Sequence, residues 1–167
     1  MKYSFSTKGW HSNTFEEFCQ VAKELKFQGI ELHNIGNRLF TDVDGAFHDY
    51  TAAATVRKLY EMKLSIPCID TICNIADKST EKQSIDEISK CIEIAANLKI
   101  PYVRIHSGAF ENIEEGAENT ARIIEKVLEA AEKKGITILV ETSGIFCNTS
   151  ILRDLLNRFA CDNLAAL

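Results

Sequence analysis

Short apolar runs recur along the chain at nearly constant spacing, and each run ends on a polar residue. The runs are FQGIELH (27–33), KLSIPCID (63–70), KIPYVRIH (99–106) and KGITILVE (134–141). Each run is rich in Ile, Val and Leu, as expected of buried strands. Their last residues are spaced 37, 36 and 35 positions apart: His33, Asp70, His106 and Glu141. The pattern therefore predicts a repeated structural unit with a period near 36 residues.

Segments with helical spacing of apolar residues lie between these runs. They cover residues 15–25, 51–62, 85–98, 117–131 and 149–159. Two pairs have the spacing of a capping box at a helix start, Thr14 with Glu17 and Thr80 with Gln83. The sequence KKG at 133–135 is a helix stop signal, because lysines in the last turn and a following glycine both favour termination.

Alternating strands and helices predict an α/β protein with a parallel sheet covered by helices. A further strand at 3–7 brings the expected number to about five βα units, and residues 162–167 begin a sixth strand. An open doubly wound sheet and a (β/α)8 barrel both fit this order. The uniform repeat and the polar strand ends favour the barrel. The fingerprint G-x-G-x-x-G is absent after the first strand, which disfavours a dinucleotide-binding fold.

The chain is shorter than a complete barrel. It has 167 residues, whereas a (β/α)8 barrel needs about 250. We therefore expect a partial TIM barrel with parallel strands, forming a single domain over residues 1–167 that is truncated at the start of strand six.

Composition and charge narrow the classes of partner and location. Hydrophobic residues make up 46% of the chain, enough for one sizeable core, and no stretch has the length and hydrophobicity of a membrane span. The net charge of −5 disfavours nucleic acid as the main partner. None of the six cysteines has C-x-x-C spacing, so we expect reduced cysteines in the core and a cytoplasmic location.

Side chains inside the predicted barrel include two charges of opposite sign. Neighbouring residues of a strand face opposite sides, so Glu31 shares a face with His33, and Arg104 shares one with His106. A buried charge needs a partner, and we predict an ion pair between Glu31 and Arg104 below the barrel mouth. The alternative is that one of these two side chains is exposed.

The four polar strand ends are the candidate chemistry. Two imidazoles and two carboxylates on one rim are a plausible divalent-metal or acid–base site, formed by His33, Asp70, His106 and Glu141. Each alone also fits a hydrogen-bonded structural residue. Glu141 is the strongest candidate, because it follows the apolar run ITILV, where a carboxylate needs a cation or a donor.

Two loops add to this rim. Trp10 and His11 follow the first strand and form either an aromatic wall for a sugar or a structural contact under a loop. Residues 34–48 are long for a βα connection, so we interpret them as a rim or lid loop.

Three segments resemble a known family. GIELH (29–33), VRIHSG (103–108) and ILVETSG (138–144) look like strands two, four and five of the xylose isomerase-like barrels. The resemblance covers essentially the whole chain, in order. That superfamily includes sugar-phosphate isomerases and epimerases, ketose 3-epimerases, inosose dehydratases and apurinic endonucleases.

The resemblance implies a TIM barrel that binds a divalent ion, namely Mn, Mg, Co or Zn. Glu141 matches the glutamate that ends strand five, which is a metal ligand and one of two glutamates that move the proton. His106 matches the histidine that ends strand four. The resemblance implies catalytic roles for Glu141 and His106 and metal binding by Glu141. From their own positions at the rim, we predict that His33, Asp70 and Trp10 bind the substrate.

The implied reaction is proton transfer next to the carbonyl of a small sugar or sugar phosphate. The family's other metal ligands come from strands six to eight, so we expect this chain alone to have little or no isomerase activity and to bind a metal weakly or not at all. A first alternative is a metal-dependent phosphodiesterase of the apurinic endonuclease type. Four histidines and a net charge of −5 argue against it. A second is a non-enzymatic fragment that self-associates. Whether the chain is a fragment of a sugar enzyme or a non-enzymatic fragment, we expect a homo-oligomer that covers open sheet edges.

Overall fold

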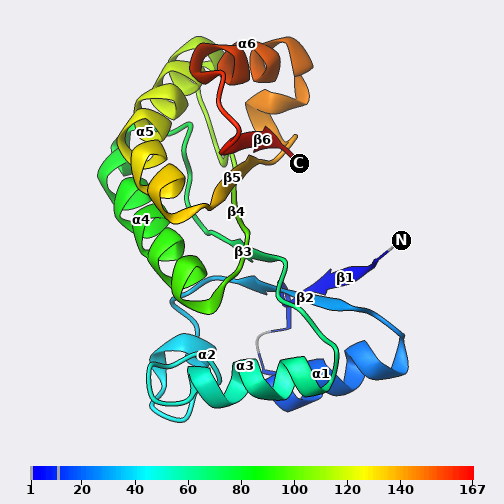
Figure 1. Cartoon of the computed structure of the whole chain (residues 1–167). Helices are drawn as coiled ribbons and strands as arrows, with labels where there is room; N and C mark the ends of the chain where they lie inside the picture. Colours follow the sequence, from blue (N-terminus) through cyan, green and yellow to red (C-terminus); the bar gives the residue numbers. More distant parts are fainter. Residues whose placement is uncertain (1, 11) are drawn as a thin grey trace. The chain divides into compact units, whose positions relative to one another are not determined.

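The computed structural model describes residues 2–10 and 12–167 and divides into two compact units. Unit 1 extends to Asp70, and unit 2 begins at Thr71. The elements of unit 1 are β1 (Ser4–Ser6), α1 (Phe15–Glu24), β2 (Gly29–His33), α2 (Arg38–Thr41), α3 (Ala52–Glu61) and β3 (Cys68–Asp70) (Figure 1).

The strands of unit 1 pair in parallel and in chain order. β1 pairs with β2 in a register that sets Phe5 opposite Ile30. β2 pairs with β3 so that His33 lies opposite Asp70. The predicted strand 63–70 is divided, with an isolated bridge between Gly29 and Ser65 before β3. Pro67 lies at this division, and proline lacks the N–H that a continuous ladder requires.

The first helix of unit 1 starts where the sequence predicts. Thr14 accepts a hydrogen bond from the backbone N–H of Glu17 at 3.3 Å, and the Glu17 carboxylate accepts one from the Thr14 N–H at 2.6 Å. The predicted capping box at Thr14 is therefore confirmed. The loop expected at 34–48 contains the short helix α2.

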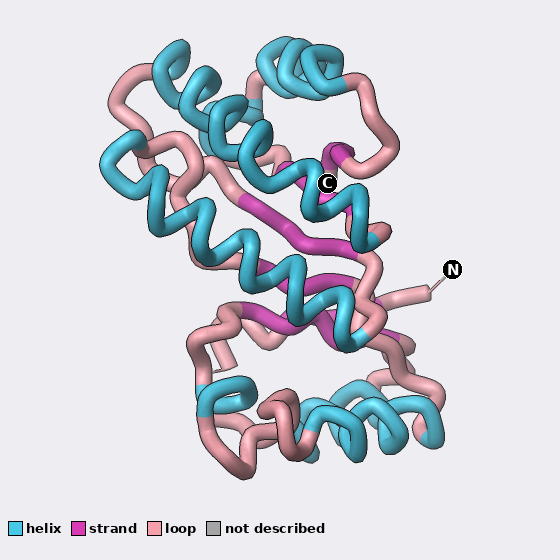
Figure 2. The backbone as a smooth tube through the Cα atoms, turned by 60° about the vertical axis from the view of Figure 1, so that its left-hand side comes forward, coloured by secondary structure: helices cyan, strands magenta, loops and turns pink. Residues whose placement is uncertain are grey.

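Unit 2 repeats the alternation of helix and strand. Its main elements are α4 (Glu81–Leu98), β4 (Tyr102–Ile105), α5 (Ile113–Lys134), β5 (Thr137–Val140), α6 (Thr149–Phe159) and β6 (Leu164–Ala166). Short 3₁₀ turns precede α4 (η1, Lys78–Thr80) and α6 (η2, Gly144–Cys147). β4, β5 and β6 are parallel and adjacent in chain order. α4 packs on β4, α5 packs on β5, and the two helices contact each other (Figure 2).

Alternation along β4 and β5 decides which side chains face away from these helices. Val103, Ile105, Ile138 and Val140 have no exposed surface. Arg104 and Leu139, which are opposite each other in the register, face the other side of the sheet. His106 and Glu141 directly follow these strands and continue the same alternation.

In unit 2, the predicted end of α5 is confirmed and the predicted capping box at the start of α4 is wrong. α5 stops at Gly135, whose φ of 67° is in the left-handed region, which confirms the stop signal. The predicted capping box of Thr80 with Gln83 is wrong, because Thr80 makes no side-chain cap bond to α4. Its hydroxyl instead donates to the backbone oxygens of Asn74 at 2.7 Å and Asp77 at 3.0 Å. The turn η1 brings these carbonyls within reach, and they compete with the cap.

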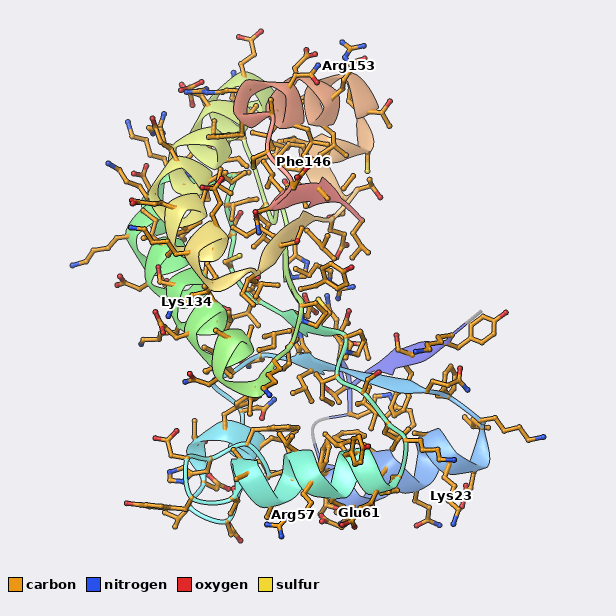
Figure 3. The ribbon with its side chains drawn as sticks, viewed as in Figure 1. Lys23, Arg57, Glu61, Lys134, Phe146 and Arg153 are labelled. Atoms are coloured by element: carbon orange, nitrogen blue, oxygen red, sulfur yellow. The ribbon has the colours of Figure 1, made fainter. Side chains whose placement is uncertain are left out.

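Each unit buries apolar side chains and carries most of its charged side chains on the surface. Figure 3 shows Phe146 within unit 2 and the charged side chains of Arg57 and Arg153 pointing away from the ribbon. Phe146 has no exposed surface. Cysteines are buried in both units, Cys19 and Cys68 in unit 1 and Cys73 and Cys91 in unit 2.

The α/β class with parallel strands is confirmed by these elements. Across the residues that the structure describes, no helix combines the length and apolar character needed to cross a membrane. The single truncated barrel domain expected over 1–167 stays a prediction.

Candidate functional site

Glu141 is the first residue after β5, at the carboxyl end of a strand whose inward neighbours are fully buried. Its backbone N–H donates to the oxygen of Ile105 at 3.0 Å, which continues the ladder between β4 and β5 by one residue. The strand therefore fixes the backbone of Glu141, while its side chain keeps an exposed fraction of 30%. A carboxylate in this position is held by the protein and still accessible to a ligand.

Two nitrogen groups of unit 2 contact this carboxylate. Nε of Arg104 lies 3.4 Å from Oε2 of Glu141, and Nδ1 of His106 lies 3.2 Å from the same oxygen. Arg104 and His106 are 15% and 13% exposed at their side chains, so the contacts are largely screened from water. In unit 2 as described, both of these contacts fall on Oε2.

The ring of His106 is oriented by the backbone of Thr71. Nε2 of His106 lies 2.5 Å from the Thr71 carbonyl oxygen. A carbonyl only accepts, so Nε2 carries a hydrogen, and Nδ1 is left to face Glu141. Contact between Nδ1 and Oε2 is favourable when one proton lies between them. We call Thr71, Arg104, His106 and Glu141 the Glu141 cluster, whose imidazole and carboxylate are groups that can share a proton.

The loops after the strands of unit 2 are locked together around this cluster. The Thr71 N–H and hydroxyl both donate to the Arg104 carbonyl, at 3.1 and 2.9 Å. Gly144 has a φ of 56°, and a Cβ added there would lie 2.4 Å from Oγ of Ser107. Only glycine permits this approach of the loop after β5 to the loop after β4.

A second pair of predicted residues meets in unit 1. Nδ1 of His33 lies 2.7 Å from Oδ2 of Asp70, whose side chain has no exposed surface. Direct opposition of the two residues in the register of β2 and β3 places them there. This geometry is a carboxylate that orients an imidazole, the arrangement that fixes the tautomer of acid–base histidines.

Trp10 lies near the carboxyl ends of β1 and β2. It is 41% exposed, and its ring packs 5.9 Å from Phe5 and 6.1 Å from Phe18, measured between ring centroids. It lines a cavity of about 260 Å³ together with His33. His11, the other half of the expected aromatic wall, lies outside the described residues.

The structure brings the predicted residues together in two groups. His106 and Glu141 meet in unit 2, and His33 and Asp70 meet in unit 1. The predicted ion pair of Glu31 with Arg104 would join the two units and stays a prediction. Sequence reasoning missed the contact of Arg104 with Glu141, although its position two residues before His106 was a signal. It also missed Thr71, whose backbone role leaves no sequence signal.

A family model and a curated relative match the sequence of this chain. A family model described as xylose isomerase-like TIM barrel matches residues 19–166. A curated relative, the "Probable endonuclease 4" of Natronomonas pharaonis, is 34% identical over 113 residues, which are 66% of this chain and 37% of the relative.

Solved structures share the fold at low sequence identity. The probable 3-DHS dehydratase AsbF from Bacillus anthracis superimposes with a TM-score of 0.77 at 20% identity, over 99% of this chain and 62% of its own. A D-tagatose 3-epimerase-like protein gives a TM-score of 0.75 at 17% identity, over 98% and 63%. The IolI protein, solved with a zinc atom, gives 0.76 at 14%, over 98% and 61%. The chain thus spans just over a third of the curated relative and less than two thirds of these structures.

Proposed function

Because the chain belongs to the xylose isomerase-like TIM barrel family, we propose that the protein serves in the isomerisation or epimerisation of a small sugar or sugar phosphate. The reaction class is proton transfer at a carbon next to a carbonyl. The observation that carries the proposal is the Glu141 carboxylate, anchored at Oε2 by Arg104 and His106 and 30% exposed at its side chain. An epimerase-like protein among the structural neighbours supports the substrate class.

In the proposed step, Glu141 accepts the proton from the carbon next to the carbonyl. The electron pair of the broken C–H bond forms a carbon–carbon double bond, and the carbonyl oxygen becomes negative. Delivery of a proton to the opposite face of the same carbon, from a second donor such as water, gives an epimer. Delivery of the proton to the former carbonyl carbon, with transfer of the neighbouring hydroxyl proton to the former carbonyl oxygen, gives an isomer. His106, fixed by the Thr71 carbonyl, and Arg104 hold the carboxylate in place. By extension, we propose His33, Asp70 and Trp10 as substrate-binding residues.

A divalent metal ion is the cofactor that the family implies, and one structural neighbour was solved with zinc. Among the described side chains, no group of three or more His, Cys, Asp or Glu residues is placed to hold a metal ion. Glu141 supplies one ligand, and its Oε2 already contacts two nitrogen groups. The described residues therefore do not make up a metal site. The step proposed above uses the chain's own side chains.

Deuterium exchange tests the proposal without requiring complete turnover. A single base suffices to exchange the proton next to a carbonyl, so wild-type protein in D₂O should introduce deuterium into a ketose at that carbon. Glu141→Gln should lower the exchange rate by about 100-fold or more, the usual effect of losing a general base. NMR of D-fructose and D-tagatose provides the measurement, with and without added Mn²⁺.

Glu129→Gln is the matched control, because Glu129 lies on the surface of α5 with its side chain 76% exposed and pairs with Lys133. Exchange by this variant should equal that of the wild type. Equal exchange by wild type and Glu141→Gln would refute the proposed role of Glu141.

A phosphodiesterase of the apurinic endonuclease type is the second candidate, and the curated relative favours it. Such an enzyme would need His106 as a metal ligand. Both ring nitrogens of His106 are engaged, Nε2 with Thr71 and Nδ1 with Glu141. The net charge of −5 also opposes binding to a phosphate backbone. We therefore expect no cleavage of duplex DNA containing an abasic site in the presence of Zn²⁺, and cleavage that is lost in His106→Gln would favour this candidate instead.

We further propose a reducing, cytoplasmic location. Its support is the thiol form of all the cysteines in the described chain, four of which are buried.

A further inference from the structure

A groove of about 310 Å³ lies between α5 and α6 in unit 2, apart from the Glu141 cluster. Ile113, Ala117 and Ala121 line it at four-residue spacing, so they form one stripe along α5. Ile151 and Leu155 line it from α6. The alanine side chains are too small to fill the space between the two helices, which leaves an apolar recess. We call this feature the α5–α6 groove.

Acidic side chains dominate the rim of the groove. Glu118 pairs with Arg158 across the two helices, with Oε2 of Glu118 2.8 Å from Nη1 of Arg158. Asp154 pairs with its neighbour Arg153 at 2.9 Å. Glu114 also lines the groove, and among the described residues it has no ion-pair partner. The groove therefore combines apolar walls with an unbalanced negative charge, which suits an apolar side chain that has a positive charge beside it.

The end of α1 in unit 1 presents that combination. Leu25, the residue that caps α1, is 64% exposed. Lys23 and Lys26 flank it, and in the described part of the chain neither lysine forms an ion pair. Glu24, which lies between Lys23 and Leu25, already accepts a hydrogen bond from the Gln20 amide at 2.8 Å. Lys23 projects from the last turn of α1 in Figure 3. We call Lys23, Leu25 and Lys26 the Leu25 knob.

Charge distinguishes Leu25 from Val43, another exposed aliphatic side chain of unit 1. Val43 is the more exposed of the two, at 70%, but Asp42 and Asp44 flank it. Two carboxylates next to the acidic rim of the groove are repelled, whereas lysines are attracted. The Leu25 knob is therefore the better electrostatic match for the groove.

We propose that the α5–α6 groove of one molecule binds the Leu25 knob of a second copy of this chain. Leu25 then leaves water for the apolar walls of the groove, and the flanking lysines approach Glu114. Knob and groove are different surfaces, so the contact is heterologous, and the pair keeps one free knob and one free groove for further copies. Neither surface takes part in the reaction proposed above.

Sedimentation velocity measures the contact, at protein concentrations up to about 1 mM. One leucine and two lysine stems bury far less than the about 1,600 Å² of a standard interface, so the association should be weak and reversible. All chains carry Ala166→Lys, because the edge of β6 offers a separate route to association by strand pairing. This parent protein should form species larger than the monomer as its concentration rises. A monomer at every concentration would overturn the proposal.

Leu25→Ala tests the knob. It should raise the Kd of association about ten-fold or more, because it removes most of the apolar surface that the groove covers. Val43→Ala is the matched control, since it shortens a side chain of similar exposure in the same unit, and it should leave the Kd unchanged. Equal Kd values for the parent and Leu25→Ala would count against the knob and overturn the proposal.

Ala117→Leu tests the groove. Leucine has nearly the helix propensity of alanine, so α5 is retained while the added side chain fills the recess and prevents association. Glu114→Lys leaves the apolar walls intact and should weaken association several-fold through charge repulsion. Glu132→Lys, at an exposed position near the end of α5, is its control. Unchanged association by either Ala117→Leu or Glu114→Lys would overturn the proposal.

Mixing two variants separates binding between molecules from contacts within one molecule. Leu25→Ala keeps its groove and Ala117→Leu keeps its knob, so each alone should be largely monomeric. An equimolar mixture should form a one-to-one dimer and nothing larger, because the knob of Ala117→Leu enters the groove of Leu25→Ala. A mixture that stays as monomeric as its components would overturn the proposal.

Discussion

Gly108 shows how a single residue sets the geometry of the loops next to the Glu141 cluster. Its φ is 71°, and a Cβ built there would lie 2.3 Å from Oδ1 and 2.8 Å from Cβ of Asn74. The clash includes Cβ of Asn74, so rotation of the Asn74 amide group does not relieve it. The glycine of the HSG motif is therefore required for both its conformation and its lack of a side chain.

We expect Gly108→Ala to lower the free energy of unfolding by about 1–3 kcal/mol more than Gly135→Ala does. Both glycines have positive φ, so both substitutions carry the left-handed cost of about 1–2 kcal/mol. A Cβ at Gly135 meets no atom within 4 Å, so the difference between the variants isolates the clash with Asn74. Urea denaturation of the two variants gives the comparison, and equal losses would contradict it.

For single residues, the sequence predicted which side chains share a face or rim better than it predicted which side chains contact each other. The 35-residue spacing of His106 and Glu141 predicted a shared rim, and the two side chains meet at 3.2 Å. Strand alternation also placed Arg104 on the correct face. Its contact with Glu141 depends on the strand register, which single-sequence patterns do not specify. The bond of His106 to Thr71 uses only the backbone carbonyl of Thr71, so the residue type at position 71 could not have indicated it.

At the scale of elements, a charge pair joins the two long helices of unit 1. Nζ of Lys58 on α3 lies 2.8 Å from Oε1 of Glu16 on α1. Hydrogen bonding to Lys58 is the main cause that holds the pKa of Glu16 below its ordinary value. A lowered carboxyl pKa means that the pair stabilises the fold above the unfolded-state pKa, near 4.5, and loses this effect as the pH falls through the folded-state pKa.

Lys58→Met should therefore be less stable than the wild type at pH 7 by a few tenths to about 1 kcal/mol, the range of exposed ion pairs. This gap should shrink below a pH of about 4.5 and vanish once Glu16 is protonated. Thermal unfolding across that pH range measures it. Arg57→Met, an exposed neighbour on α3, is the control, and its gap should not change with pH. A gap for Lys58→Met that persists in acid would contradict the role of Glu16.

Elements were predicted most accurately where strong local signals occur. α6 begins and ends at the predicted residues, and α5 stops at the predicted glycine. β3 is shorter than expected because the apolar run at 63–70 includes Pro67. The Thr80 capping box failed because the Thr80 hydroxyl donates to the backbone carbonyls of Asn74 and Asp77 and makes no cap bond to α4. Competition of this kind depends on how the preceding loop folds.

At the scale of the whole molecule, we expect the chain to self-associate. β1 pairs with β2, and β6 pairs with β5, and in the residues described neither has a second neighbouring strand. The other edge of each strand carries backbone groups that can pair with another chain. Sedimentation velocity at increasing concentration should show a growing oligomer fraction, and Ala166→Lys, a charge at the β6 edge, should reduce it. A monomer at every concentration would contradict this expectation.

The buried cysteines allow the transient opening of each unit to be measured separately. Cys19 and Cys68 lie in unit 1, and Cys73 and Cys91 lie in unit 2, whereas Cys147 is exposed. Burial raises the pKa of the Cys19 thiol, which slows its reaction further. A thiol reagent thus modifies Cys147 at once and reaches the four buried cysteines only during transient openings of the unit that contains them. Mapping the modification rates by mass spectrometry would show whether the two halves of the chain open as one cooperative body or as two.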